Sequence, residues 1–541
     1  MPPSSPSTVP NATTMSSAAV PPLSAVGSTA GGIAKGRSKS PRGVSTLMYA
    51  CQQGDVEKVR RLLRAQPTVL EKRDRTGKTA LHYCCTSDSL FAAQAADLLV
   101  MAAPDLVESR DEDGFTPLHL AVIAGNMPLV TFLLANNADV NAVDSEKHTV
   151  VHWATVCGET GALRAVLAAG APVSTPDIHG GYPLHYAAQM CGGEKDSSLG
   201  LQVLQTLLQH PDIKVNVEDG EGRQPLLWAS SAGSAKAVLA LIRAGSTVDA
   251  SDKDGLTALH CAASRGHTDC IDTLLTLCGM SPDVIDSNGC TALHYSVTLG
   301  HADATALLLA HGADPNRQDR KGRSSAHCGC AKGQFETVKL IGTNNANLWL
   351  KNARGDLPLH EAAASGRRDL VKWLLEARPS QVNARNNDGR CPLHLAALND
   401  NADMCKILLD AGAQVNPVLR TSKNVFMTPL DCALQRGFRS TAKSTAKYLQ
   451  LHGGVPASRM STSKMKIPNG IPNVHQREDL NLWRGESTSD SERECGENEE
   501  KTRRRHRRRL NHRHDRKKES AVTDEEETKR MQSGTGVIGD G

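Results

Sequence analysis

The sequence predicts an all-α fold: a solenoid of paired antiparallel helices with turn or β-hairpin fingers, flanked by disordered tails. Two observations predict it. One pattern recurs twelve times between Met48 and Asp431, mostly at intervals of 33 or 34 residues, and each copy holds two apolar stripes at helical spacing. The segments outside these copies are polar or charged and carry no apolar periodicity. A pair of short helices cannot bury its own apolar faces, so the copies must stack on one another.

Each copy combines a turn with two helices, and the copy that begins at Asp113 shows these parts most clearly. Gly114 tolerates the positive φ of a tight turn. Thr116 can cap a helix whose first turn accommodates Pro117, and Gly125 ends that helix. The apolar residues expected to line the two helices are Leu118, Ala121, Val122, Leu129, Val130, Leu133 and Leu134.

Several segments carry a recognisable motif. Residues 113–121 read Asp-Gly-Phe-Thr-Pro-Leu-His-Leu-Ala, residues 357–363 read Leu-Pro-Leu-His-Glu-Ala-Ala, and residues 312–316 read Gly-Ala-Asp-Pro-Asn. They resemble the ankyrin-repeat motif, which joins Thr-Pro-Leu-His-x-Ala, a glycine, an apolar second helix and Gly-Ala-Asp-Val-Asn. The resemblance covers roughly Gly43 to Gly454. It implies an ankyrin-repeat solenoid in which the motif histidine, present in nine copies, hydrogen-bonds within and between neighbouring repeats.

The chain is expected to divide into three parts. Residues 1–42 form a disordered tail rich in Pro, Ser and Thr, residues 43–455 form the solenoid, and residues 456–541 form a disordered charged tail with a basic cluster at 503–518. We place the repeats approximately at 44–73, 77–107, 114–143, 147–176, 180–217, 222–251, 255–285, 289–318, 322–351, 355–385, 389–418 and 425–454.

Two departures from the pattern affect the expected packing. The fifth interval is 42 residues long, and the extra residues fall at Cys191–Ser198, between the two helices of that copy. This loop should protrude from the stack, either as a binding element or as a tolerated insertion. Gly329 falls inside a helix, where glycine costs about 1 kcal/mol relative to alanine. We therefore expect a soft point there.

Charge and cysteine content constrain the partners and the compartment. The net charge is +4, but the solenoid contains 39 basic and 42 acidic residues, so it is not a general polyanion binder. Nucleic acid is expected to bind only through the basic C-terminal tail. The 15 cysteines lie almost all within the repeats, which indicates a reducing compartment. Without an apolar run near the ~20 residues that span a bilayer, we expect no integral membrane segment and a cytoplasmic location, with the nucleus as an alternative.

No catalytic set is apparent, so the chain is predicted not to be an enzyme. His360-Glu361 begins like a zinc-protease helix, but position 364 is alanine rather than the second histidine. The segment from His327 to Cys330 lacks a second Cys/His pair at ligand spacing. We therefore expect no catalytic residue, no metal, no cofactor and no small-molecule substrate.

Two sets of residues are candidates for binding a partner protein. The residue after the motif histidine position is aromatic in five copies, and these side chains either pack between repeats or reach the concave groove as binding anchors. The candidates of this first set are Trp153, Tyr186, Trp228 and Tyr295, with Tyr83 in the same position. The finger tips are acidic in the middle of the array and basic toward its C-terminal third. These residues either bind a charged partner or are simply solvated turn residues. The candidates of this second set are Glu112, Glu146, Asp254, Arg320 and Arg354.

The tails contain candidate regulatory sites. Ser40 precedes a proline and lies beside basic residues, and Ser489 and Ser491 lie beside acidic residues, so all three resemble phosphorylation sites. The basic cluster is a candidate nuclear-import signal, an RNA or anionic-lipid contact, or a solvated tail. The candidate import residues are Arg503, Arg504, Arg505, Arg507, Arg508, Arg509, Lys517 and Lys518.

Two hypotheses for the function follow from the sequence. In the first, the solenoid is a non-enzymatic scaffold or adaptor that binds one or more proteins in its concave groove and on its finger tips. In the second, the chain is the recognition or targeting subunit of an enzyme complex such as a ubiquitin ligase, kinase or phosphatase. The second hypothesis requires a docking motif in a tail, and none is apparent after Gly454.

Overall fold

The computed structural model describes residues 44–192, 197–421, 425–435 and 440–460. Within these ranges, short helices follow one another in twelve antiparallel pairs, as the sequence predicts. The pairs are α1 (Thr46–Gln53) and α2 (Val56–Ala65), α3 (Ala80–Cys85) and α4 (Ala92–Ala102), α5 (Pro117–Ile123) and α6 (Met127–Ala135), α7 (Val150–Val156) and α8 (Thr160–Ala168), α9 (Pro183–Met190) and α10 (Ser197–Leu208), α11 (Pro225–Ala232) and α12 (Ala235–Arg243), α13 (Ala258–Arg265) and α14 (Thr268–Asp272), α15 (Ala292–Leu299) and α16 (Ala302–Ala310), α17 (Ser325–Lys332) and α18 (Phe335–Thr343), α19 (Pro358–Ala364) and α20 (Arg368–Ala377), α21 (Pro392–Leu398) and α22 (Ala402–Asp410), and α23 (Pro429–Gln435) and α24 (Ser440–Leu451).

Several short elements extend these pairs. The second helix of the seventh pair continues as the π-helical segment η6 (Thr273–Leu277). The 3₁₀ helices are η4 (Pro67–Glu71), η5 (Pro104–Glu108), η7 (Pro379–Asn383) and η8 (Ala457–Arg459). No helix of the described residues is both long and apolar enough to cross a membrane.

The first helix of each pair begins and ends for local reasons, which α5 illustrates. Thr116 has extended backbone and accepts a hydrogen bond from the His119 N–H (3.4 Å), while His119 Nδ1 accepts the Thr116 N–H (3.3 Å). Pro117 occupies the first turn, where no backbone donor is needed. Gly125 ends the pair's first segment at φ 63°. The roles that the sequence predicts for Thr116, Pro117 and Gly125 are thus confirmed.

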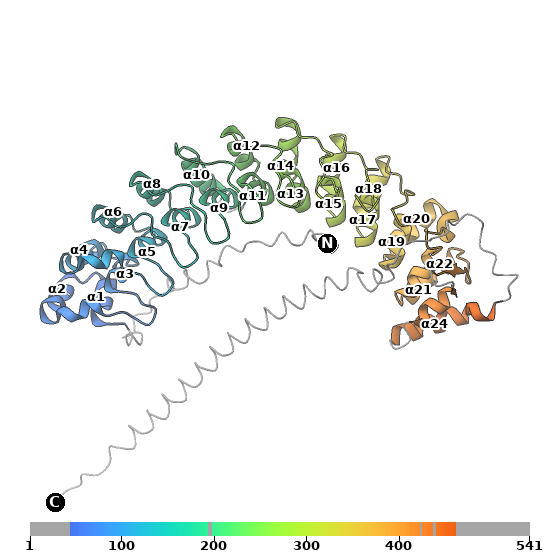
Figure 1. The fold of residues 1–541 in the computed structure, drawn as a ribbon, viewed down its shortest axis with the longest axis horizontal. Helices are drawn as coiled ribbons and strands as arrows, with labels where there is room; N and C mark the ends of the chain where they lie inside the picture. The colour runs from blue at the N-terminus through green and yellow to red at the C-terminus, as the bar shows by residue number, and fades with distance from the viewer. Residues whose placement is uncertain (1–43, 193–196, 422–424, 436–439, 461–541) are drawn as a thin grey trace, which may run out of the picture. The chain divides into compact units, whose positions relative to one another are not determined.

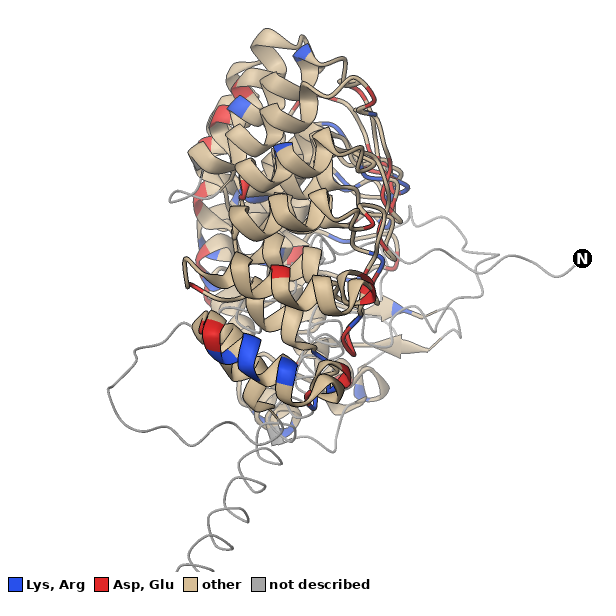
Figure 2. Ribbon diagram, turned by 90° about the vertical axis from the view of Figure 1, so that its left-hand side faces the viewer, with Lys and Arg blue, Asp and Glu red and all other residues tan. Residues whose placement is uncertain are grey.

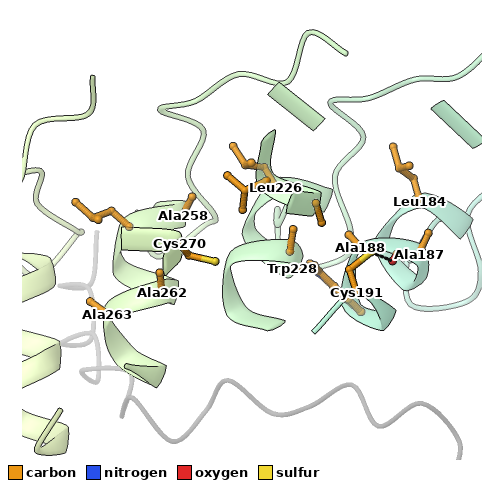
Figure 3. Close-up of a cluster of buried hydrophobic side chains, with 14 of the residues drawn as sticks. Leu184, Ala187, Ala188, Cys191, Leu226, Trp228, Ala258, Ala262, Ala263 and Cys270 are labelled. Carbon is orange, nitrogen blue, oxygen red and sulfur yellow. Dashed lines mark hydrogen bonds between the residues drawn. The ribbon is translucent and has the colours of Figure 1, made fainter. Parts of the chain in front are cut away.

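The core is continuous because like helices pack on like helices. First helices stack on the first helices of neighbouring pairs, and second helices do the same, in a bent row with the first helices on its inner side (Figure 1). Alanine allows close approach where α9, α11 and α13 meet, as Ala187, Ala188, Ala258 and Ala262 show (Figure 3). Trp228 fills the larger space beside them and is 9% exposed.

A finger is the loop that leads from one pair to the first helix of the next. Each finger tip donates one backbone hydrogen bond to the preceding tip: Glu112 N–H to Thr76 O and Ser145 N–H to Asp113 O, both at 2.9 Å. Equivalent bonds recur as far as the Asn387 tip, so the tips form one connected row. The last finger is a two-stranded hairpin of β1 (Leu419–Arg420) and β2 (Phe426–Met427).

Several sequence predictions concern residues outside the described ranges. The loop of the fifth copy separates α9 from α10, and both helices are in place on either side, but residues 193–196 are not described. Residues 1–43 and 461–541 also lie outside the described ranges. They include the candidate phosphorylation sites Ser40, Ser489 and Ser491 and the basic cluster 503–518.

Gly329 has a packing role that the sequence did not reveal. Helix α17 is continuous through it, and a Cβ at this position would lie 2.6 Å from Val338 Cγ2 and 2.8 Å from Val297 Cγ1. Both distances are far below van der Waals contact, so glycine is what allows α17 to approach its two neighbours. The expected soft point thus stays a prediction, but the structure adds that Gly329 lies at a close contact between α17 and its neighbours.

Replacing Gly329 with Ala should lower the free energy of unfolding by about 1–2 kcal/mol, although alanine is the better helix former. The methyl group would push α17 away from two buried valines. Gly161→Ala in α8 is the matched control, because its nearest neighbour would be Met127 Sδ at 3.4 Å. Urea unfolding should show that control unchanged or stabilised. A Gly329→Ala protein as stable as the wild type would contradict the close packing.

Candidate protein-interaction surface

One acidic or amide side chain organises each finger before the final hairpin from within. Asp144 Oδ1 accepts the backbone N–H groups of Glu146 (2.9 Å) and His148 (2.8 Å), which closes the finger turn. The same pair of bonds is made by Asp74, Asp111, Asp177, Asp219, Asp252, Asp286, Asp319, Asn352 and Asn386. We call these ten side chains the finger carboxylates and amides. They fix the tips in one repeated conformation.

The aromatic side chains singled out in the sequence bind these finger carboxylates. Trp153 Nε1 donates to Asp144 Oδ2 at 3.0 Å, and the Tyr295 hydroxyl donates to Asp286 Oδ2 at 2.7 Å. The other three make the same bond nine residues along the chain: Tyr83 to Asp74 (2.7 Å), Tyr186 to Asp177 (2.6 Å) and Trp228 to Asp219 (3.0 Å). This pairing was not predicted, although the spacing of nine residues recurs five times in the sequence.

The rings of these aromatic residues also pack on aromatic rings of neighbouring repeats. Phe115 and Trp153 are 5.3 Å apart edge to face, and Tyr186 and Trp228 are 5.8 Å apart in the same way. Tyr186 and Trp228 are 8% and 9% exposed, while Trp153 and Tyr295 are half-buried. Packing between repeats is thus visible in the structure. Among the four candidates, only Trp153 and Tyr295 are not buried.

Replacing Tyr295 with Phe should cost about 1–3 kcal/mol of unfolding free energy, because it leaves a buried carboxylate oxygen without its donor. Asp286, the acceptor, is 4% exposed. Tyr182→Phe is the control, since its hydroxyl makes no hydrogen bond within the described ranges. Chemical denaturation of both variants would test the pairing. Equal stability of the two proteins would mean that the Tyr295 hydroxyl is not structural.

Seven of the nine motif histidines hold neighbouring repeats together, as the family resemblance implies, whereas Nε2 of His119 and of His394 is buried without a hydrogen-bond partner among the described residues. His82 Nδ1 accepts the Thr79 N–H (3.1 Å), which leaves Nε2 as the donor to Phe115 O of the next repeat (3.0 Å). His152 repeats the arrangement with Thr149 and the Gly181 carbonyl. Burial lowers the pKa of His82 and of His152 to about 4, so both rings are neutral near pH 7.

His148 differs from the motif histidines because it lies between two finger carboxylates. Its Nδ1 is 3.2 Å from Asp144 Oδ2, and its Nε2 is 3.7 Å from Asp177 Oδ2. Burial alone would lower its pKa, but the hydrogen bond and charge of Asp144, with the charges of Asp177 and Glu146, raise it above its ordinary value. A protonated His148 therefore ties two successive fingers together.

The predicted charged residues all lie exposed at finger tips. Glu112, Glu146, Asp254, Arg320 and Arg354 are exposed, and the connected row of tips places them in that order. In Figure 2 the fingers lie together along one edge of the stack, with acidic and basic segments among them. Arg354 is held by a carboxylate of its own finger, with its Nε 3.3 Å from Asp356 Oδ2. The structure thus brings the finger candidates into one surface, apart from the aromatic rings beneath them.

The described residues show no metal-binding arrangement of three or more His, Cys, Asp or Glu side chains. Their 14 cysteines are free, and burial raises the pKa of Cys261 and of Cys405 to about 12, which leaves these thiols unreactive. An open cleft of about 380 Å³ lies beside α24 and brings no catalytic set together. Its lining residues are Asn399, Asp400, Asn401, Ala402, Asp403, Thr441 and Ser444.

Comparison with protein families gives matches along nearly all of the solenoid. The family model described as "Ankyrin repeats (3 copies)" matches residues 32–102, 90–177, 126–219, 226–319, 274–352, 326–418 and 359–453. Among solved structures, the human ASB11 ankyrin repeat domain is 28% identical and covers 43% of this chain and all of that chain, with a TM-score of 0.36.

Curated relatives match over about a third of the chain. Human inversin is 29% identical over 185 residues, which are 33% of this chain and 17% of inversin. The E3 ubiquitin-protein ligase KEG of Arabidopsis thaliana is 25% identical over 191 residues, 34% of this chain and 10% of that protein. The potassium channel SKOR of the same plant is 33% identical over 222 residues, 35% and 26% of the two chains. The matched region is thus a quarter or less of most of these longer relatives.

Proposed function

Because the chain belongs to the ankyrin-repeat family, we propose that it is a non-enzymatic scaffold or adaptor that holds partner proteins in its concave groove and on its finger tips. Ankyrin repeats mark a protein-interaction domain, and solenoids bind along extended inner surfaces. One observation carries the proposal: the exposed finger tips are joined by backbone hydrogen bonds into one row, with acidic tips at Glu112, Glu146 and Asp254 and basic tips at Arg320 and Arg354.

Such a row suits the recognition of a partner whose own charge changes along its length. Complementary charge accelerates association and disfavours wrong partners, and a fixed row presents it without a cost of ordering. The half-buried rings of Trp153 and Tyr295 lie beneath the tips and supply apolar surface of the kind that anchors interfaces. We propose that these two rings are the groove contacts, and that Tyr186 and Trp228 serve mainly to pack the repeats.

A role as the recognition subunit of an enzyme complex is the second candidate. The similarity to a protein named as an E3 ubiquitin ligase favours it. In that case a partner held by the fingers would be presented to a catalytic subunit. For either role we propose a cytoplasmic site of action, which the free cysteines support. Import into the nucleus through the cluster 503–518 and phosphorylation at Ser40, Ser489 and Ser491 remain hypotheses from the sequence.

Affinity purification of the full-length protein from cells would test the proposal. The finger variant changes Glu112, Glu146, Asp254, Arg320 and Arg354 to Ala. The control variant changes the same numbers of acidic and basic residues, all exposed on second helices. The control residues are Asp303, Glu336, Glu376, Lys339 and Lys372.

Partners that the wild type and the control retain, and that the finger variant loses, would support a finger-mediated scaffold. A catalytic subunit among them would favour the second candidate. If all partners of the wild type also purify with the finger variant, the fingers do not carry recognition and the proposal is wrong.

A further inference from the structure

The two fingers that follow the Asp319 finger have an uncharged amide in place of the finger carboxylate. Asn352 and Asn386 occupy the position that is aspartate in the eight preceding described fingers. The Asn352 amide oxygen still accepts the N–H groups of Arg354 and Asp356, both at 2.9 Å, so the turn is unchanged. The substitution therefore removes charge without altering the finger.

The two finger-turn carboxylates nearest these amides, Asp319 and Asp356, are buried and paired, whereas Asp314 at the start of the Asp319 finger is exposed. Asp319 is 6% exposed, and its Oδ2 lies 2.8 Å from Arg323 Nη2. Asp356 is 2% exposed, binds Arg354 Nε at 3.3 Å and accepts a hydrogen bond from Asn386 Nδ2 at 2.7 Å. Neither carboxylate is free to neutralise a cation at the surface.

Four basic side chains at the same two fingers are exposed instead: Arg317, Arg320, Lys321 and Lys351. None of the four forms an ion pair with a carboxylate in the part of the chain that the structure describes. The two fingers are fixed side by side, because the Ala353 N–H donates to Lys321 O (3.0 Å) and Gln318 Nε2 donates to Lys351 O (2.9 Å). We call these four residues the basic patch.

We propose that the basic patch binds an acidic segment, a run of Asp and Glu residues, of a partner protein. This inference rests on the proposed scaffold function and specifies the partner chemistry at one part of the finger row. The four cations lie on fingers joined by hydrogen bonds and form no ion pair within the described residues. An acidic segment can therefore pair with them without first breaking such an ion pair. An extended peptide across two fingers would cover the spacing of about 10 Å between stacked helix pairs.

A protein segment fits the patch better than a nucleic acid does. The patch spans two fingers, and the following tip carries Asp388, which is exposed. The solenoid as a whole holds 42 acidic and 39 basic residues, so no long basic track continues from the patch. Nucleic acids gain affinity from many phosphate contacts along such a track.

Fluorescence anisotropy with the full-length protein would test the proposal. The probe is a short labelled peptide of alternating glutamate and serine. All proteins carry glutamine in place of the ten Lys and Arg residues of 503–518, so that the tail cannot bind the probe. The patch variant is Arg320→Glu with Lys321→Glu. The control is Lys339→Glu with Lys372→Glu, which makes the same charge change on exposed positions of second helices.

The patch variant should bind the probe at least about tenfold more weakly than the unsubstituted fingers, and the control should stay within about twofold. Binding should also weaken as salt increases. Patch and control variants that bind within about twofold of each other would overturn the inference. A single-stranded RNA oligonucleotide of equal charge that binds more tightly than the peptide, and depends on the same two residues, would overturn it in favour of nucleic acid.

The two proposals can fail separately. If the peptide does not distinguish patch from control, while cellular partners still require Glu112, Glu146 and Asp254, the scaffold function stands and only the acidic-segment assignment is wrong. If no partner depends on any finger, the scaffold proposal itself fails. Thermal unfolding of each variant establishes that the exposed substitutions leave the fold intact.

Discussion

Replacing Leu133 with Ala is expected to lower the free energy of unfolding by about 2–5 kcal/mol. Leu133 is fully buried in α6, which packs on α5 in its own pair and on α4 and α8 in the neighbouring pairs. The substitution removes buried apolar surface from a helix packed on three others and leaves a cavity in a close-packed stack. Because each repeat is stabilised by its neighbours, the loss should spread to adjacent pairs.

Urea unfolding with hydrogen exchange would measure both effects. Amides of α4 and α8 should exchange faster in the Leu133→Ala protein than in the wild type, whereas those of the distant α20 should not. Arg320→Ala and Glu112→Ala are the controls, and each should change stability by less than about 0.5 kcal/mol. If Arg320→Ala destabilised as much as Leu133→Ala, the assignment of Arg320 to a solvated finger tip would be wrong.

Acidification should destabilise the solenoid strongly well before the carboxylates are protonated. Burial lowers the pKa of six motif histidines from the ordinary 6.5: to about 4 for five of them, and to about 3 for the sixth. The six are His82, His119, His152, His185, His327 and His394. The unfolded chain then binds protons that the folded chain cannot, so stability falls as pH drops below 6.5.

The size of this effect follows from linkage. A histidine whose pKa falls from 6.5 to about 4 should lose about 2 kcal/mol of stability between pH 7 and pH 5. Six such groups acting in one array should make the unfolding midpoint in urea strongly dependent on pH in this range. A midpoint that stays constant from pH 7 to pH 5 would mean that these rings are protonated in the folded state.

His148 should show the opposite sign and serves as an internal contrast. Its pKa is raised, so its contribution is fully present below its unfolded pKa of 6.5 and is lost as pH rises through the folded value. The stability difference between wild type and His148→Gln should therefore shrink as pH increases from 6 to 9. A difference that grows with pH would contradict the pairing of His148 with Asp144 and Asp177.

Much of the fold could be predicted because its determinants are local and periodic. The capping residue Thr116, the first-turn Pro117 and the helix-ending Gly125 act within a few residues of one another. The period near 33 residues then fixes the stack, since each pair must cover the next. The exposed positions of Glu112 and Arg320 follow from the same register.

What could not be predicted depends on contacts between repeats or on partners several residues away. Gly329 lies in close contact with Val297 of the preceding pair and Val338 of its own pair. Helix propensity alone does not include these contacts, so it predicts only that glycine weakens the helix. The sequence predicts Arg354 as an unpaired finger-tip cation, but in the structure it forms an ion pair with Asp356.

The finger carboxylates show a second limit of this kind. Asp111 has Leu120 nine residues later, where five of the ten fingers have an aromatic donor, and its Oδ2 is buried without a hydrogen-bond partner among the described residues. Burial raises the pKa of Asp111, in keeping with the missing donor. The sequence showed which residues were aromatic but not what their polar atoms bind.

The backbone hydrogen bond between successive finger tips has a mechanical consequence. From Thr76 to Asn387, each tip is joined to the next by a backbone bond rather than by a sheet. Links of this kind act in series, so each carries the full force of a pull along the row and their small extensions add. Adjacent tips therefore stay fixed side by side, while the distance between tips far apart in the row can change more. A partner that binds tips far apart must therefore fix their separation, whereas a partner that binds adjacent tips need not.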